Sequence, residues 1–375
     1  MDIRADMKDV KRVVVKVGTS TLTYANGKLN LQRMETLVRE LADLANQGHE
    51  LLLVTSGAVA AGMDRMGLKK RPGSMPEKQA LAAVGQGILM HIYEKLFAEY
   101  GQTTAQVLLT KENSVRHNQY TNSRNALLTL LRIGVIPIVN ENDAIAVDEL
   151  KIGDNDTLSA TVAALVDADA LIILSDIDGV YSADPQQDHD ARLLLEIAEI
   201  TPEIEQLAGG AGSHLGTGGM HTKIEAAKIA MHAGATMVIA SGAVPGVLRD
   251  ILAGQAIGTI FPARESHLKV RKSWLAFGKR IHGELVVDGG CEKAMLEAGS
   301  SLLAAGIVSV DGDFQAGDTV RVLSLETREI ARGIVNYDAA SLQKIIGHQT
   351  GDFAQLLSGE LHDEVIHRDN MVLMA

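Results

Sequence analysis

Two lysines and two glycine-rich turns in this sequence have the chemistry that binds phosphate. Lys16 lies in the apolar run 12–17 directly before Gly18, and Lys223 follows the glycines of 216–219. A buried ammonium group requires an anionic partner, and backbone amides at a glycine turn or a helix N-terminus bind anions. The pattern therefore predicts that both lysines neutralise charge on a phosphoryl group during its transfer.

Hydroxyl, amide and carboxylate side chains follow the other apolar runs of the same region. Such groups bind an ammonium ion, orient lysines or hold hydrated magnesium. They are Ser56, Ser175, Asp176 and the polar clusters 139–143 and 153–156. With the two polar clusters counted as one junction and the two lysine segments added, the region has five such junctions, which favour a phosphoryl-transfer site over five unrelated turns.

Each junction also has a simpler interpretation when it is taken alone. A lysine in an edge strand points into solvent, Ser56 serves as a helix N-cap, and Asn and Asp are common in turns for local reasons. The spacings GxxxxGK[ST] and strand-linked GxGxxG are absent, so the glycines of 216–219 match neither of the two commonest nucleotide motifs. Phosphoryl transfer is therefore predicted from the convergence of the junctions.

Short β-branched runs alternate with longer amphipathic or alanine-rich segments up to about residue 261. The predicted strands are 12–17, 50–55, 135–140, 170–174 and 236–240, and the predicted helices are 30–47, 122–131, 157–166 and 222–233. This alternation is typical of an α/β fold with a mostly parallel sheet between two layers of helices. Ligands of such sheets bind beyond the carboxyl ends of the strands, where the junctions lie.

The pattern changes after residue 264 to short strands separated by Gly and Asp. The length of 375 residues also favours two domains over one. We expect a kinase-like domain over 1–265, a linker over 266–281, a small β-rich domain over 282–360 and a C-terminal tail over 361–375.

Composition excludes several classes of protein. The net charge of −12 disfavours broad binding to nucleic acid or to an anionic membrane. Cys291 is the one cysteine, so no intramolecular disulfide forms, and the 12 scattered histidines show no zinc spacing. No apolar run approaches the roughly 18 residues of a membrane span, and 1–11 lacks an apolar signal core, so we expect a cytoplasmic location.

Taken together, the motifs resemble those of the amino acid kinase family. The segments 14–20, 54–58, 139–143, 153–156 and 216–223 match in the same order along nearly the whole chain. The resemblance implies transfer of the γ-phosphoryl group of ATP, with Mg2+, to the side-chain carboxylate of L-glutamate. The product is then L-glutamyl 5-phosphate, which is formed in the first step of proline biosynthesis.

The resemblance also implies a role for individual residues. By the family pattern Lys16 and Lys223 stabilise the phosphoryl group, and Asp156 orients both lysines. The positions that match glutamate binding are Ser56, Asn140, Asp143, Asp154 and Asn155. The positions that match ATP binding are Lys16, Ser175, Asp176, Thr217, Gly218, Gly219, Met220, His221, Thr222 and Lys223. Ser175 stands where the family often has threonine, and no residue is assigned as a direct ligand of magnesium.

The segment 282–360 resembles the PUA domain, a fold otherwise associated with RNA modification. It holds 5 Lys and Arg against 12 Asp and Glu, a net charge of 5 − 12 = −7, which is a poor surface for binding RNA. We therefore expect a structural or regulatory role for it. The family further suggests a homo-oligomer that proline inhibits.

Two alternatives stay open at this stage. A kinase that forms another acyl phosphate, such as one acting on aspartate, would share the phosphate-binding residues and differ in the substrate loops. The second alternative is an RNA-binding PUA protein whose kinase domain is inactive. The retained lysines and glycine turns argue against this alternative.

Overall fold

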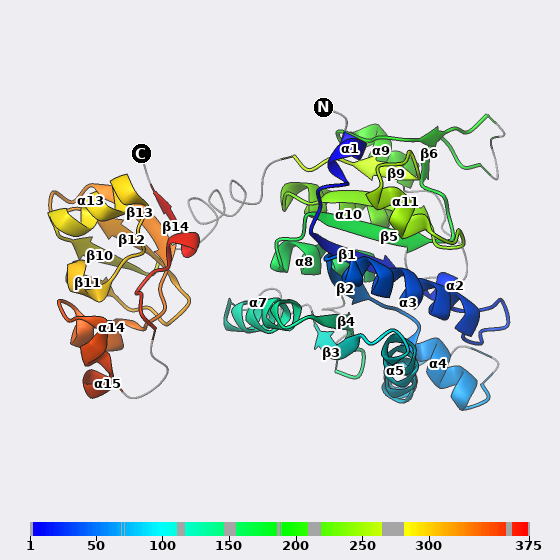
Figure 1. Cartoon of the computed structure of the whole chain (residues 1–375), viewed down its shortest axis with the longest axis horizontal. Coiled ribbons are helices and arrows are strands. Elements are labelled where there is room, and N and C mark those ends of the chain that lie inside the picture. The colour runs from blue at the N-terminus through cyan, green and yellow to red at the C-terminus, as the bar shows by residue number, and fades with distance from the viewer. Residues whose placement is uncertain are drawn as a thin grey trace. The chain divides into compact units, whose positions relative to one another are not determined.

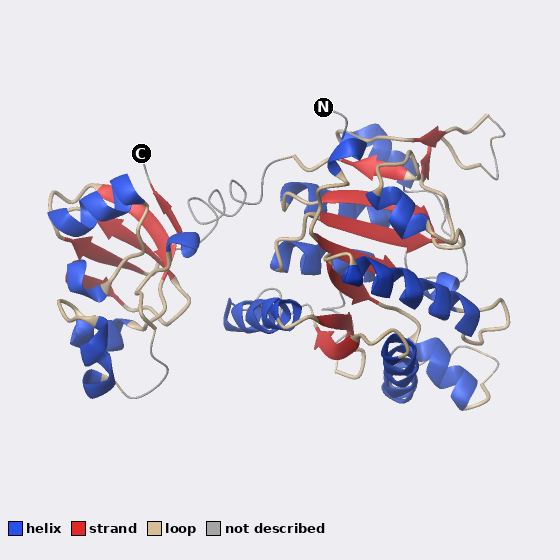
Figure 2. Ribbon diagram, viewed as in Figure 1, coloured by secondary structure: helices blue, strands red, loops and turns tan. Residues whose placement is uncertain are grey.

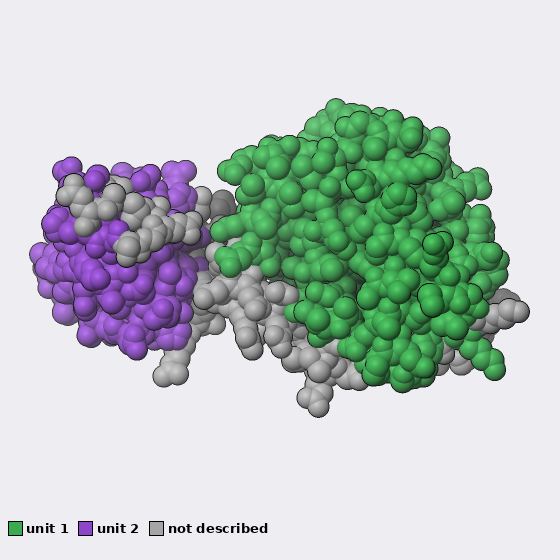
Figure 3. Space-filling model, turned by 90° about the horizontal axis from the view of Figure 1, so that it is seen from below, with its two compact units in different colours: residues 1–267 green, residues 268–375 purple. Residues whose placement is uncertain are grey.

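The computed structural model describes residues 3–68, 70, 72–110, 117–145, 155–185, 188, 190–208, 219–264, 281–357 and 362–373. The chain divides into two compact units, Met1–His267 and Leu268–Ala375 (Figure 3). Each unit has its own hydrophobic core, as expected for a chain that exceeds the size of one core. No helix in the described parts of the chain is long and apolar enough to cross a membrane.

A seven-stranded sheet forms the centre of the first unit (Figure 1). Its strands in spatial order are β3 (Thr103–Leu109), β4 (Val135–Glu141), β2 (Glu50–Val54), β1 (Arg12–Val17), β5 (Ala170–Ser175), β8 (Thr236–Ser241) and β9 (Thr259–Phe261). All neighbouring pairs are parallel except β8 and β9, which are antiparallel. The carboxyl ends of six strands therefore lie at one edge of the sheet.

Helices cover both faces of this sheet (Figure 2). One face packs against α3 (Leu31–Asn46), α4 (Ala58–Arg65), α5 (Met75–Ala98) and α11 (Val247–Leu252). The other face packs against α7 (His117–Arg132), α8 (Asn155–Leu165) and α10 (Met220–His232). The smaller elements are α1 (Ile3–Asp6), α2 (Thr19–Leu22), β6 (Val180–Tyr181), β7 (Leu193–Leu194) and α9 (Pro202–Ala208).

The α/β fold with a mostly parallel sheet is confirmed, and each of the five strands predicted from the sequence is present in it. The strands β3 and β9 were not predicted. Apart from the buried Leu109, the residues of β3 are exposed or half-buried, so its run lacks the continuous apolar signal of its neighbours. The helix that carries Lys223 begins at Met220 and therefore includes this lysine in its first turn.

The helices α4 and α5 touch through their backbones. A Cβ atom on Gly85 of α5 would lie 1.7 Å from the carbonyl oxygen of Ala58, and one on Gly62 of α4 would lie 2.0 Å from that of Leu81. Real atoms do not approach so closely, so glycine at both positions is what lets these helices meet. The helix α4 starts directly after Ser56 and Gly57, so this contact also fixes the end of β2 relative to α5.

Replacing Gly85 by alanine is expected to destabilise the first unit by about 1–3 kcal/mol, because the added methyl group forces α4 away from α5. Urea unfolding measures the loss. Gly87→Ala is the matched control, since a Cβ atom on Gly87 of the same helix meets no atom of the described residues within 4 Å. That control should gain about 0.5–1 kcal/mol from helix propensity. Equal stability of the two variants would contradict the close packing.

The second unit is built on a five-stranded sheet in the order β11 (Ile307–Gly312), β10 (Gly283–Val287), β12 (Thr319–Leu323), β13 (Glu329–Ile334) and β14 (Met371–Leu373). Only β10 and β12 are parallel, and the other pairs are antiparallel. Its helices are α13 (Gly289–Ala298), α14 (Ala339–Ile345) and α15 (Phe353–Leu356), and its single turns are η2 (Ala304–Gly306), η3 (Thr350–Asp352) and η4 (Arg368–Asn370).

The residues that were expected to form a C-terminal tail take part in this second unit. Strand β14 pairs with β13, and Ile366 forms a bridge with Leu302. Three residues are too short a run to predict as a strand from sequence, whereas in the fold they complete the sheet. Cys291 of α13 is half-buried, and burial together with Asp288 raises the pKa of its thiol to about 11, so it stays protonated at neutral pH.

Candidate active site

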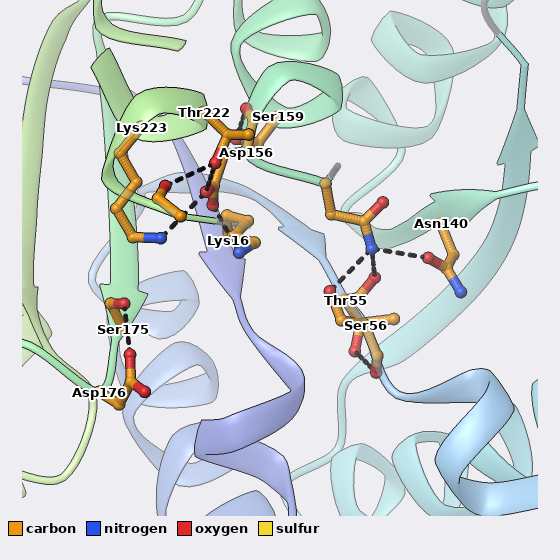
Figure 4. A network of polar contacts seen from close by, with 12 residues as sticks. Lys16, Thr55, Ser56, Asn140, Asp156, Ser159, Ser175, Asp176, Thr222 and Lys223 are labelled. Carbon is orange, nitrogen blue, oxygen red and sulfur yellow. Dashed lines mark hydrogen bonds and ion pairs between the residues drawn. The ribbon is translucent and has the colours of Figure 1, made fainter. Parts of the chain in front are cut away.

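A buried carboxylate lies between two buried lysines at the carboxyl edge of the sheet (Figure 4). The Nζ atom of Lys16 is 2.5 Å from Oδ1 of Asp156, and the Nζ atom of Lys223 is 3.1 Å from Oδ2. Asp156 is 0% exposed, Lys16 is 6% exposed and Lys223 is 4% exposed. The structure thus brings together the three residues predicted to carry catalysis, and it excludes the alternative of a solvent-exposed Lys16.

Strand alternation and two helix starts place these three groups. Side chains alternate along β1, so Lys16 points to the face that Val14 occupies, and this face is covered by α8 and α10. Asp156 lies in the first turn of α8 and Lys223 in the first turn of α10. The cluster therefore sits at two helix N-termini, where the helix dipoles favour an anion.

The hydroxyl of Thr222 fixes Asp156 from the side. Its Oγ1 donates to Oδ2 of Asp156 at 3.0 Å and also lies 2.8 Å from the carbonyl oxygen of Gly219. Ser159 donates to the backbone carbonyl of Asp156 at 2.6 Å. Two ammonium groups and one carboxylate have a net charge of +1, so the cluster is suited to hold a further anion, such as a phosphoryl group, between the lysines.

A second polar network lies beside the first and is centred on Asn155. Its Nδ2 donates to the carbonyl oxygen of Thr55 at 2.7 Å, to Oγ of Ser56 at 2.8 Å and to Oδ1 of Asn140 at 3.0 Å. These groups come from the ends of β2 and β4, which the sheet order places side by side. Amide and hydroxyl groups gathered in this way can hydrogen-bond a small polar substrate.

The two networks are joined covalently, because Asn155 and Asp156 are consecutive residues of α8. A ligand bound at the Asn155 network is therefore held at a fixed distance from the two lysines. Such positioning is most of what catalyses in-line phosphoryl transfer.

The other predicted residues differ in how far the structure describes them. Ser175 is 6% exposed and donates to Asp176 at 3.1 Å at the end of β5. Gly219 is the N-cap of α10, Met220 is half-buried and His221 is exposed in its first turn. Asp143 is half-buried after β4, whereas Asp154, Thr217 and Gly218 lie outside the described residues.

Two polar residues of α5 also belong to this site, and the sequence pattern does not predict them. Gln86 accepts from Nδ2 of Asn140 at 2.8 Å, and the hydroxyl of Tyr93 lies 2.8 Å from Oγ1 of Thr55. Tyr93 is fully buried, and burial raises the pKa of its phenol far above the ordinary value. Both residues lie within a helix and not at the end of a strand, so a prediction based on polar residues at strand ends does not include them.

The fold and the lysine-rich site define a kinase that transfers a phosphoryl group at the edge of a parallel sheet. Residues 11–241 match the model of the amino acid kinase family, and residues 283–357 match that of the PUA domain. The chain belongs to the amino acid kinase family and carries a C-terminal PUA domain.

The curated relatives narrow the class further. The chain is 52% identical over 373 residues to the glutamate 5-kinase of Moorella thermoacetica, covering 100% of this chain and 99% of the relative. It is 51% identical to the glutamate 5-kinase of Thermoanaerobacter sp. strain X514, covering 97% and 98%, and 48% identical to that of Deinococcus radiodurans, covering 97% and 100%. A crystal structure of UMP kinase from Bacillus anthracis is 17% identical, with a TM-score of 0.49, and covers 68% of this chain and 97% of its own.

Proposed function

We propose that this chain is a glutamate 5-kinase, which transfers the γ-phosphoryl group of ATP to the side-chain carboxylate of L-glutamate. The observation that carries the proposal is the adjacency of Asn155 and Asp156. Asn155 belongs to the polar network that can bind an amino-acid substrate, and Asp156 contacts the two lysines that can bind a phosphoryl group. The identity of about one-half with glutamate 5-kinases over almost the whole chain supports the same acceptor.

In the proposed reaction an oxygen of the glutamate side-chain carboxylate attacks the γ-phosphorus atom of ATP. One P–O bond to this carboxylate forms as the P–O bond to ADP breaks, and the products are L-glutamyl 5-phosphate and ADP. The nucleophile is already ionised at neutral pH, so no general base is required. Repulsion between the anions is the barrier, and Lys16 and Lys223 lower it by neutralising charge on the transferring group.

Asp156 keeps the two ammonium groups apart and aimed at the phosphoryl group. We assign Ser56, Asn140, Asp143, Asp154 and Asn155 to glutamate, and Ser175, Asp176 and residues 217–223 to ATP. The carboxylate of Asp156 already pairs with two lysines and no residue is assigned as a direct ligand of magnesium, so the ion would be held by the phosphates of ATP and by water. When bound there, the ion adds to the charge neutralisation that the lysines supply.

Trapping of the acyl phosphate tests the acceptor and separates the alternatives. The protein is incubated with magnesium-ATP, hydroxylamine and one of glutamate, aspartate or N-acetylglutamate, and the hydroxamate is measured. We expect glutamate to give hydroxamate at a rate at least about 100-fold above the others, because specific polar contacts discriminate strongly. If only aspartate gave hydroxamate, the proposal would be refuted and the protein would be an aspartate kinase.

We propose a structural or regulatory role, and not RNA binding, for the PUA domain. Its three described arginines between 282 and 357 are each paired with glutamate: Arg321 with Glu284, Arg328 with Glu292 and Arg332 with Glu329. Paired arginines offer little positive charge to phosphates. We further propose a cytoplasmic location, because ATP and glutamate are available there. We also propose that proline inhibits the enzyme and that the chain assembles into a homo-oligomer.

A further inference from the structure

The carboxamide of Gln86 reaches the Asn140–Asn155 network from helix α5. Its Oε1 accepts from Nδ2 of Asn140 at 2.8 Å, whereas its Nε2 is shielded from solvent and has no hydrogen-bond partner among the residues that the structure describes. A buried amide donor without a partner costs on the order of 1–3 kcal/mol. A site that retains such a donor is ready to give it to a ligand.

Packing holds this donor in place. Gly85 brings the backbone of α5 against that of α4, which begins just after Ser56. Seven residues after Gln86, Tyr93 lies on the same face of α5 and bonds to Thr55 at 2.8 Å. The donor is therefore fixed between the ends of β2 and β4.

The order of the strands tells which end of a substrate this donor meets. Lys16 is on β1, Ser56 follows the neighbouring strand β2, and Asn140 is on β4, the next strand along. Adjacent strands are about 4.8 Å apart, so Asn140 is two strand spacings from Lys16. Gln86 contacts Asn140 and so lies at the end of the site remote from the phosphoryl group.

We propose that Nε2 of Gln86 binds the α-carboxylate of the glutamate substrate while its Oε1 fixes Asn140. This inference rests on the proposed function, in which the side-chain carboxylate faces the lysines. The α-ammonium group cannot accept a hydrogen bond, whereas the α-carboxylate is an acceptor only, so an amide donor matches the carboxylate. Gln86 is thereby a residue that selects an α-amino acid over an acid without the α-carboxylate.

The variant Gln86→Glu separates the two halves of the carboxamide. A glutamate side chain still accepts from Asn140, but it cannot donate, and its charge opposes a bound carboxylate. We expect KM for glutamate to rise about 10- to 100-fold, the range for a lost charge-assisted hydrogen bond, with KM for ATP within about twofold. Gln343→Glu, on the exposed face of α14 in the second unit, controls for the added charge and should match the parent.

The decisive readout compares glutamate with 4-aminobutyrate, which is glutamate without its α-carboxylate. Gln86→Glu should lower kcat/KM for glutamate at least tenfold and leave that for 4-aminobutyrate within about threefold. Equal losses for both substrates would overturn the inference and leave Gln86 as a support for Asn140. A parent enzyme that phosphorylates no glutamate would instead refute the proposed function itself, so the two failures are distinguishable.

Discussion

Replacing Lys223 by alanine is expected to lower kcat by about 10³-fold and to leave KM for glutamate within a few-fold of the parent. The Nζ atom of this lysine is 3.1 Å from Asp156, and the residue is 4% exposed, so water cannot readily replace its positive charge in the site. Removing one preorganised positive group from a phosphoryl-transfer site costs on this order. Steady-state kinetics with varied glutamate and ATP measures both constants.

Lys228 on the same helix provides the matched control. Its ammonium group pairs with Glu205 and Glu225, and these hydrogen bonds raise its pKa, so it stays charged and away from the cluster. Lys228→Ala should keep kcat within about twofold, since exposed pairs contribute little. Turnover of Lys223→Ala equal to that of the parent would contradict the role of Lys223.

Replacing Asp156 by asparagine is expected to lower both activity and stability. The change keeps the size of the side chain but leaves two buried ammonium groups without the carboxylate that both now contact. Breaking a buried charge pair in this way typically costs 3–5 kcal/mol. We expect Tm to fall by several degrees and kcat by at least about 10²-fold, because the lysines no longer hold their geometry.

Binding of magnesium-ATP gives this second prediction a readout that general damage would not give. The phosphates supply the negative charge that Asp156→Asn removes, so ATP should raise the Tm of the variant more than that of the parent. Asp43→Asn, at an exposed position of α3, is the control and should match the parent. A variant with parental Tm and kcat would show that Asp156 does not organise the lysines.

Much of the site could be predicted because strand ends mark it. Lys16 is a charged residue in an apolar run, and Asp156 and Lys223 lie at the starts of helices. In a parallel sheet the strand end and both helix starts are expected at the same edge, so the topology alone places these residues near one another. The pairing of both lysines with one carboxylate could not be predicted from residue types, because it depends on the packing of α8 against α10 over the same face of the sheet.

The site residues of helix α5 could not be predicted from the sequence. Gln86 and Tyr93 lie in an alanine- and glycine-rich helix whose solvent and core faces differ little in sequence. Their importance depends on Gly62 and Gly85, which let two helices touch and bring α5 over the ends of β2 and β4. Such a contact depends on backbone approach in three dimensions, which no local pattern encodes. The strand β14 was missed for a similar reason, since three residues become a strand only beside β13.

The origin of one oxygen atom tests the central claim most directly. Glutamate labelled with 18O in the side-chain carboxylate alone is incubated with magnesium-ATP, and hydroxylamine then cleaves the product at its acyl carbon. If the side-chain carboxylate attacks the γ-phosphorus atom, the released inorganic phosphate carries one 18O atom from glutamate. Phosphate without the label would contradict the account, because the transferred phosphoryl group would then never have been bound to that carboxylate.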